Sequence, residues 1–274
     1  MERSAPGHPS APGRPSIPNF RDAGGHQARD AMRVRTGLLY RSVGLSDAAE
    51  EDLRILGDLG VRTVFDLRTE TERERQPDRL PPGARLVALD VLADSGEADP
   101  AEMFELMHDP PRASAEMAGG KTEAFYVAAY RDMVDLPSAK VAYAEMYRTL
   151  VDEDRRPALV HCTTGKDRTG WAVAALLLFL GVRADVVMHE YLLSDGEVRR
   201  AFRPAIDDFV ARGGDRKVFE PLMGVQPSFL DSAIDRMHAR HGSIEAYFSD
   251  GLGLDTNTLT SLRLTYLERD RAGA

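Results

Sequence analysis

The stretch VHCTTGKDRTG, residues 160–170, decides the fold because it joins a short apolar run to a helical pattern. Residues 157–162 are predicted to form a buried strand, and residues 169–180 a buried helix. A loop that leads directly from a strand into a helix lies at the helix N-terminus, where unpaired N–H groups and the helix dipole attract anions. The stretch therefore predicts an α/β fold with an anion-binding loop at the end of a strand.

This loop has the residue types of a phosphate cradle, because its successive backbone N–H groups can turn inward and form a nest for an anion. The predicted phosphate-binding residues are Thr163, Thr164, Gly165, Lys166, Asp167 and Arg168. Gly165 permits backbone conformations that a side chain would obstruct. Arg168 can hold two phosphate oxygens with its planar guanidinium. Lys166 is expected to add a second positive charge at the rim, which favours substrates with further phosphates.

Cys162 is the expected nucleophile. It is the only cysteine in the 274 residues, so neither a disulfide within the chain nor a cysteine-based metal site can form. A helix N-terminus and nearby cations favour the thiolate, which is the reactive form. Such a thiolate can displace the leaving oxygen of a phosphate ester and form a phosphocysteine, which water then hydrolyses. His161 is expected to orient the loop through its ring nitrogens, and Thr169 to donate a hydrogen bond to the sulfur.

The leaving oxygen of a phosphate ester also needs a proton, which a carboxylic acid usually supplies. Asp167 in the loop and Asp90 after a predicted strand are equal candidates for this acid, and Asp94 is a third. Asp167 is alternatively a residue that orients the arginine or the attacking water. Asp66 and Arg68, at the end of another predicted strand, are expected to buttress the loop by ion pairing.

The rest of the chain alternates between strand and helix patterns. Strands are predicted over residues 38–41, 61–68 and 85–91, and helices over residues 46–59, with Ser46 as the cap, and 138–151. Beyond residue 184 the pattern is helical almost to the end. We expect a central sheet flanked by helices, with a helical C-terminal part, in one domain over residues 17–274. The Pro-, Ser- and Gly-rich residues 1–16 are expected to be a flexible lead-in.

Residues 92–136 are long for a simple connection and change in composition to Asp, Glu and Met. The segment has a Gly119-Gly120 break and is predicted to hold two helices. Its apolar stripe consists of Met103, Phe104, Met107, Phe125 and Tyr126. Such a stripe is most often packed core, and the alternative is a helical lid over the predicted site.

Composition limits the function classes. A formal net charge of −9 disfavours a nucleic-acid surface, which needs a basic footprint. The chain has no apolar run of about 18 residues, so no stable membrane insertion is expected. The N-terminal residues lack the hydrophobic segment of a signal peptide, which predicts a cytoplasmic location. The oligomeric state cannot be deduced from these patterns.

The quoted stretch resembles the HCxxGKDRTG loop of the multi-specific tyrosine-phosphatase family of bacteria and fungi. The likeness continues in NFRD at residues 19–22, LYRS at 39–42, DLR at 66–68 and YLLS at 191–194. This resemblance implies a cysteine-phosphatase-like sheet, a helical lid, and an acid on a separate loop near Asp90 or Asp94. It also implies hydrolysis of phosphotyrosine, and in some members of phosphoserine, phosphothreonine and phosphoinositides, without metal or cofactor.

Other functions are compatible with parts of the pattern. A dedicated phosphoinositide phosphatase and a phosphate-binding module that does not hydrolyse its ligand both remain open. A rhodanese-like sulfur carrier also uses a looped cysteine, but the Arg-Thr-Gly frame fits phosphatases better. A zinc hydrolase has little support, because His189-Glu190 is not followed by a second zinc-binding histidine.

Overall fold

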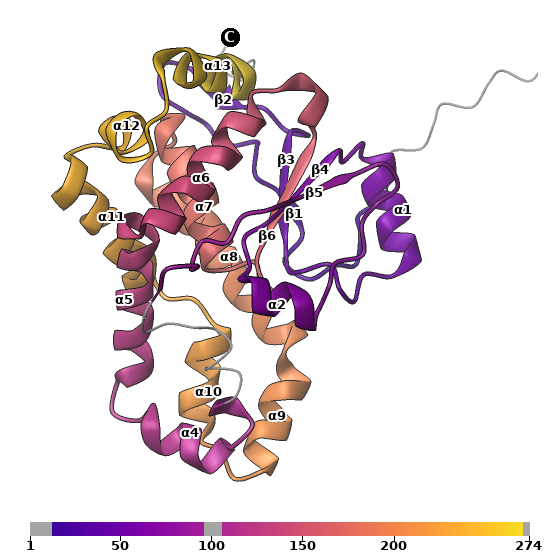
Figure 1. Ribbon diagram of the computed structural model, residues 1–274, viewed down its shortest axis with the longest axis vertical. Helices are drawn as coiled ribbons and strands as arrows, with labels where there is room; N and C mark the ends of the chain where they lie inside the picture. Colours follow the sequence, from indigo (N-terminus) through magenta and orange to yellow (C-terminus); the bar gives the residue numbers. More distant parts are fainter. Residues whose placement is uncertain (1–12, 96–105, 271–274) are drawn as a thin grey trace, which may run out of the picture.

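A five-stranded sheet lies at the centre of the computed structural model, which describes residues 13–95 and 106–270 (Figure 1). In spatial order its strands are β1 (Arg21–Asp22), β3 (Leu39–Ser42), β6 (Ala158–His161), β4 (Thr63–Asp66) and β5 (Arg85–Ala88). Strands β3, β6, β4 and β5 are parallel, and β1 is antiparallel to β3. The expected α/β architecture with a central sheet flanked by helices is confirmed.

The parallel strands end in one row. Ser42 and Asp66 both lie opposite His161, and Ala88 lies opposite Asp66. The loop after β6, which begins at Cys162, is therefore flanked by the loops that follow β3 and β4. Ligands of open α/β sheets bind outside the carboxyl ends of the strands. The register thus places the predicted anion-binding loop where such folds bind their ligands.

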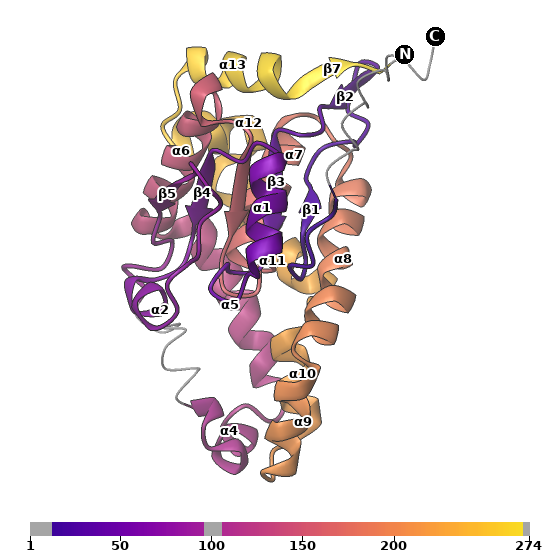
Figure 2. The same ribbon diagram turned by 90° about the vertical axis from the view of Figure 1, so that its right-hand side faces the viewer.

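Helices cover both faces of the sheet, as Figures 1 and 2 show. On one face, α1 (Glu50–Asp58) packs against Val64 and Leu159. On the other face, Phe65 and Val160 pack against a larger helical layer. Consecutive strand residues point to opposite faces, so the three inner strands β3, β6 and β4 are buried on both sides, whereas the edge strand β5 is largely exposed.

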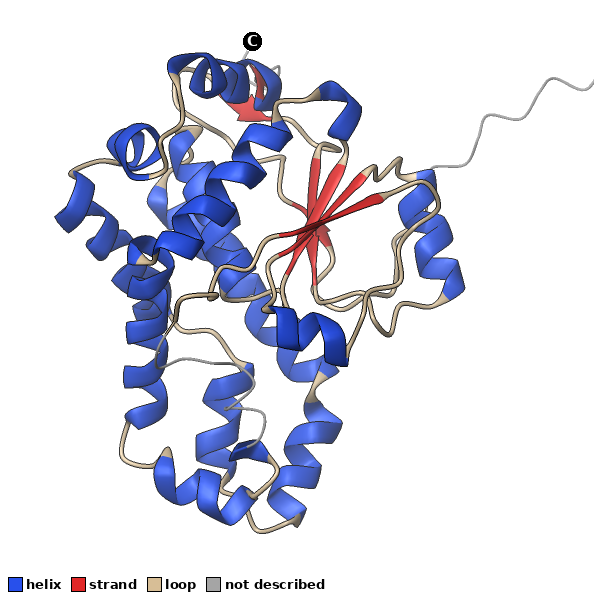
Figure 3. Ribbon diagram, viewed as in Figure 1, coloured by secondary structure: helices blue, strands red, loops and turns tan. Residues whose placement is uncertain are grey.

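The structure is rich in helices, drawn in blue in Figure 3. The remaining α-helices are α2 (Glu70–Arg75), α4 (Pro110–Glu116), α5 (Lys121–Asp135), α6 (Pro137–Leu150), α7 (Arg168–Phe179), α8 (Ala184–Ala201), α9 (Arg203–Ala211), α10 (Arg216–Met223), α11 (Pro227–His241), α12 (Ile244–Ala246) and α13 (Thr256–Tyr266). The structure also has a short 3₁₀-helix, η1 (Glu153–Arg155), and a short π-helix, η2 (Tyr247–Gly251). Helix α7 follows the Cys162 loop and is buried along nearly its whole length. Its apolar sequence therefore fixes the position of the loop in the core.

Helices α4, α9 and α10 form an extension below the sheet (Figures 1 and 2). Helix α5 connects this extension to the helical layer beside the sheet. The extension has its own apolar cluster, which includes Ala113, Phe209 and Leu222. The described part of residues 92–136 thus holds the two expected helices, α4 and α5, with Gly119 and Gly120 between them. Met103 and Phe104, part of the predicted stripe, lie outside the described residues.

Two details differ from the sequence predictions, and a third prediction falls partly on residues that the structure does not describe. Helix α1 begins at Glu50 instead of Ser46, and the Asp52 carboxylate accepts a hydrogen bond from the N–H of Ala49 at its start. The C-terminal part is helical up to Tyr266, as expected, and ends in an unpredicted strand, β7 (Leu267–Arg269), which pairs antiparallel with β2 (Met32–Val34). Residues 1–12 of the expected flexible lead-in lie outside the described residues, and Ser16 at its end is hydrogen-bonded to Asp52.

Among the described helices, none is both long enough and apolar enough to cross a membrane.

Candidate active site

The Cys162 loop makes a tight turn at Gly165. This residue has a φ of +64°, in the left-handed region that favours glycine. A Cβ atom added there would lie 2.0 Å from the carbonyl oxygen of Ser42. Both the backbone conformation and the close approach of the β3 end therefore require glycine at this position.

Side chains outside the loop hold its carbonyl groups. The Gly165 oxygen accepts hydrogen bonds from Asn19 Nδ2 at 2.9 Å and from Arg41 Nη2 at 2.7 Å. Arg41 is itself paired with Glu190 at 2.8 Å. Because the C=O and N–H of a trans peptide point in opposite directions, these bonds turn the N–H of Lys166 away from Asn19 and Arg41. The NFRD and LYRS segments, which hold Asn19 and Arg41, thus act as a brace behind the loop.

Arg168 is held by Glu72, a residue that the sequence analysis did not identify. Its Nη1 and Nη2 atoms lie 2.6 and 2.8 Å from the two carboxylate oxygens of Glu72, and the Thr163 hydroxyl also donates to this carboxylate. Burial alone would raise the pKa of Glu72, but the charge and hydrogen bonds of Arg168 outweigh burial and lower this pKa to about 2. Thr69 caps α2, and its N–H donates to Glu72. This Thr-x-x-Glu capping box was the available sequence signal.

A second buried ionic cluster lies behind Cys162. Nδ1 of His161 is 3.1 Å from the carbonyl oxygen of Cys162, and Nε2 is 3.1 Å from Oδ2 of Asp78. Arg68 pairs with both Asp66 and Asp78 at 2.8 Å, so the expected ion pair of Asp66 and Arg68 is present. Burial would raise the pKa of Asp78, but His161 and Arg68 together lower it to about 2. The cluster fixes the end of β6 from which the loop starts.

The same cluster is the one group of three metal-ligand side chains found among the described residues. The ligand atoms of Asp66, Asp78 and His161 lie within 4.8 Å of one another. The guanidinium of Arg68 already pairs with both carboxylates. Because a cation already neutralises these carboxylates, the three residues fit a buried ion-pair cluster and do not fit a metal centre.

Cys162 itself is buried, with 1% of its surface exposed. Thr169, which was expected to donate to its sulfur, is also buried. Within residues 13–95 and 106–270, the Thr169 hydroxyl makes no hydrogen bond to the sulfur or to any other atom. The predicted bond is therefore not formed in this structure.

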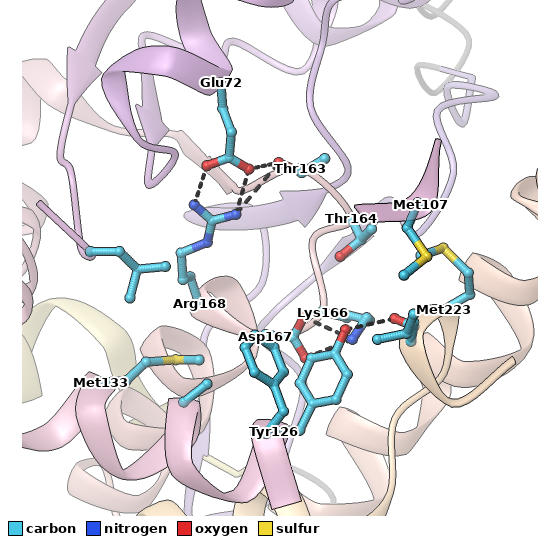
Figure 4. Close-up of a pocket in the computed structure, with 14 residues that line it drawn as sticks. Glu72, Met107, Tyr126, Met133, Thr163, Thr164, Lys166, Asp167, Arg168 and Met223 are labelled. Atoms are coloured by element: carbon cyan, nitrogen blue, oxygen red, sulfur yellow. Dashed lines mark hydrogen bonds and ion pairs between the residues drawn. The ribbon is translucent and has the colours of Figure 1, made fainter. Parts of the chain in front are cut away.

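The loop opens into a cavity of about 130 Å³ (Figure 4). The loop contributes Thr163, Thr164, Lys166, Asp167 and Arg168, and Glu72 lies beside them. The other walls are apolar and consist of Leu92, Met107, Phe125, Tyr126, Ala129, Met133, Leu222 and Met223. Helices α5 and α10 supply most of these apolar residues. Met107, Phe125 and Tyr126 of the predicted stripe therefore line the cavity at the loop and do not merely fill a core.

Lys166 does not lie exposed at the rim as the sequence suggested. Only 1% of its surface is exposed, and its Nζ is 2.8 Å from the Asp167 carboxylate. The ammonium also lies 4.1 Å from the ring centroid of Tyr126. Helix α5 covers the loop tip and buries the lysine, which the local sequence could not reveal. Figure 4 shows Lys166, Asp167 and Tyr126 grouped together, with Glu72 and Arg168 forming a separate pair.

The three candidate acids occupy different environments. Asp167 lines the cavity. Asp90 accepts hydrogen bonds from the backbone N–H groups of Glu70 and Leu92, and Asp94 accepts from Ser138. Neither Asp90 nor Asp94 is among the residues that line the cavity. Of the three candidates, Asp167 is the one that lines the cavity, and the assignment of the acid stays a prediction.

A family model described as the tyrosine phosphatase family matches residues 14–268 of the chain. The chain belongs to this family and is a phosphatase. It is 34% identical over 243 residues to a protein of Cupriavidus necator whose name designates a tyrosine-protein phosphatase; the match covers 88% of this chain and 84% of that protein. It is also 30% identical over 269 residues to the triple specificity protein phosphatase PtpB of Mycobacterium tuberculosis, covering 89% and 95%.

Among solved structures, the catalytic core of Siw14 matches with a TM-score of 0.35 and 14% identity, over 84% of this chain and 96% of that one. This likeness is too distant to bear on the site.

Proposed function

We propose that this phosphatase hydrolyses phosphotyrosine in proteins through a phosphocysteine on Cys162, and that it also accepts phosphoserine, phosphothreonine and phosphoinositides. The observation that carries the choice of substrate is the apolar cavity at the loop, whose walls include the rings of Phe125 and Tyr126. Aromatic side chains stack favourably on an aromatic ring. An aryl phosphate ester suits such walls better than a polar inositol ring does.

In the first step, the Cys162 thiolate attacks phosphorus, an S–P bond forms and the bond to the leaving oxygen breaks. Asp167 gives its proton to that oxygen. The loop N–H groups and the guanidinium of Arg168 hold the phosphate oxygens as charge develops on them. Glu72 engages both terminal nitrogens of Arg168 and so fixes the direction of this guanidinium.

In the second step, water attacks phosphorus, the S–P bond breaks and the thiolate is regenerated. The Asp167 carboxylate takes the proton from this water, so the residue returns to its starting form. The sum is phosphate ester plus water giving alcohol and phosphate. The support for Asp167 over Asp90 and Asp94 is its place in the cavity lining, together with the capping roles of the other two.

Two observations bear on broad specificity, and they point in opposite directions. A relative named for triple specificity supports it. The buried pairing of Lys166 with Asp167 weighs against Lys166 as a free site for additional phosphates. Phosphoinositides are therefore proposed as secondary substrates, and a dedicated phosphoinositide phosphatase is the less favoured alternative.

Initial rates with a metal chelator present would test this proposal on a phosphotyrosine peptide, a phosphoserine peptide and a soluble phosphoinositide. We expect kcat/KM to be at least about tenfold higher for phosphotyrosine, which corresponds to about 1.4 kcal/mol. Phe125→Ala should lower this preference about fivefold, because one aromatic contact is worth about 1 kcal/mol. A phosphoinositide as the fastest substrate would favour the alternative. No phosphate release from any of them would favour a binding module.

A further inference from the structure

Two tyrosine hydroxyls form a hydrogen-bonded chain that ends at the Asp167 carboxyl group. The hydroxyl of Tyr130, from α5, lies 3.0 Å from Oδ1 of Asp167 and 2.7 Å from the hydroxyl of Tyr191, from α8. Both tyrosines are fully buried. Burial and the neighbouring Asp167 raise the pKa of each well above its ordinary value. Both hydroxyls therefore keep their protons at neutral pH.

The direction of the hydrogen bonds follows from the proton count. Tyr130 has one hydroxyl hydrogen, and it donates this hydrogen to Oδ1 of Asp167. Tyr191 must then donate to the oxygen of Tyr130. Lys166 lies 2.8 Å from both Oδ1 and Oδ2, so it does not distinguish the two oxygens. Tyr130 contacts Oδ1 alone, which leaves Oδ2 as the oxygen that can carry the acid proton.

The last glycine of the quoted stretch makes room for this arrangement. A Cβ atom at Gly170 would lie 3.1 Å from two carbons of the Tyr191 ring, closer than ordinary packing allows. Tyr191 packs edge-on to Tyr130, with ring centroids 6.1 Å apart. Gly170 in the loop motif and Tyr191 in the YLLS segment therefore belong to one structural unit, although 20 positions separate them in the sequence.

We propose that Tyr130 is a positioning residue that orients the Asp167 carboxyl group, so that Oδ2 delivers the proton to the leaving oxygen. Tyr191 holds Tyr130 in place. Because Tyr130 lies on α5, the packing of this helix over the loop is coupled to proton transfer. This inference rests on the proposed role of Asp167 as the acid, and it adds the groups that align that acid.

The test uses the dependence of kcat/KM on the leaving group, because proton donation matters most when the leaving oxygen is strongly basic. Phenyl phosphate and p-nitrophenyl phosphate provide a poor and a good leaving group. Tyr130→Phe should lower kcat/KM about tenfold for phenyl phosphate and less than about twofold for p-nitrophenyl phosphate. Tyr147→Phe is the matched control, since Tyr147 is equally buried but donates to the backbone oxygen of Ala172 at 2.8 Å. It should not change the ratio of the two rates.

Asp167→Asn separates this inference from the function on which it rests. If Asp167 is the acid, Asp167→Asn alone makes the rates depend steeply on the leaving group, and adding Tyr130→Phe to it has no further effect on that ratio. A steep dependence in Asp167→Asn with an unchanged ratio in Tyr130→Phe would overturn the positioning role and leave the acid intact. An unchanged ratio in Asp167→Asn would overturn both.

Tyr191→Phe provides a second variant, should Tyr130→Phe fold poorly. It leaves the bond between Tyr130 and Asp167 in place and removes only the bond that holds Tyr130. We expect a loss on phenyl phosphate of about threefold, in the same direction as for Tyr130→Phe. An unchanged ratio in a folded Tyr191→Phe protein would contradict the role given to Tyr191 and with it the proposed chain of hydroxyls.

Discussion

Replacing Glu72 by glutamine should lower both the free energy of unfolding of the protein and its rate of phosphate release. Glu72 is buried, and its carboxylate is the counter-ion of the buried Arg168 guanidinium. Glutamine keeps the size of the side chain but removes the charge. The Arg168 charge is then left in the core without its partner, and the fork that directs the guanidinium towards phosphate is weakened.

The expected magnitude follows from the pKa of Glu72, which folding lowers from 4.5 to about 2. Since each pKa unit corresponds to about 1.4 kcal/mol, the folded state favours the carboxylate by about 3 kcal/mol. Removing one partner of a buried ion pair typically costs about 3–5 kcal/mol, which agrees. Domains are commonly stable by about 5–15 kcal/mol, so the variant should still fold. A misdirected Arg168 should also lower kcat/KM about a hundredfold.

Urea unfolding of the two proteins at several pH values measures this effect. A lowered carboxyl pKa contributes stability above the unfolded pKa and loses it as the pH falls towards the folded one. The difference in unfolding free energy between the proteins should therefore be constant from about pH 8 to pH 5 and should shrink by about 1 kcal/mol by pH 3.5. Glu74→Gln, on the exposed side of the same helix, is the control and should change little. A Glu72→Gln difference below about 1 kcal/mol at pH 7, or one that does not change with pH, would show that Glu72 is not the stabilising counter-ion of Arg168.

Two further substitutions test how the loop is held. Gly165→Ala should reduce phosphate release at least a hundredfold or prevent folding, because its Cβ would overlap the Ser42 carbonyl oxygen and φ is +64°; near wild-type rates with an unchanged melting temperature would contradict the described turn. Asn19→Ala removes two hydrogen bonds to the loop carbonyls, so we expect about 1–3 kcal/mol less stability in urea unfolding and about tenfold lower kcat. A loss of stability with unchanged kcat would show that Asn19 supports the fold without shaping the loop.

The sequence was most informative where local pattern and chemistry coincide. The strand ending at His161, the glycine turn at Gly165 and the helix that follows lie within a short stretch, and each has a local cause. The ion pairing of Asp66 and Arg68 was also predictable, because Asp66 ends β4 and Arg68 follows two residues later, at the edge of the sheet where the loop begins.

The misses all depend on contacts between distant parts of the chain. Glu72 reaches Arg168 across the β4 loop, and only its capping box could have drawn attention to it. The burial of Lys166 depends on how α5 packs over the loop, which no local pattern encodes.

The short strands β2 and β7 were missed for a related reason. Each has three residues, and they pair across most of the length of the chain. Three residues are too few to establish a strand periodicity. Their pairing depends on the completed fold and not on a preference of either segment.

The proposed function depends above all on covalent phosphorylation of Cys162 during turnover. Rapid acid quenching of the enzyme with a radiolabelled phosphotyrosine peptide, in the presence of a metal chelator, tests it most directly. We expect label on the proteolytic fragment that contains Cys162, and neither label nor phosphate release for Cys162→Ser. Phosphate release that persists in Cys162→Ser, or label on another residue, would contradict it.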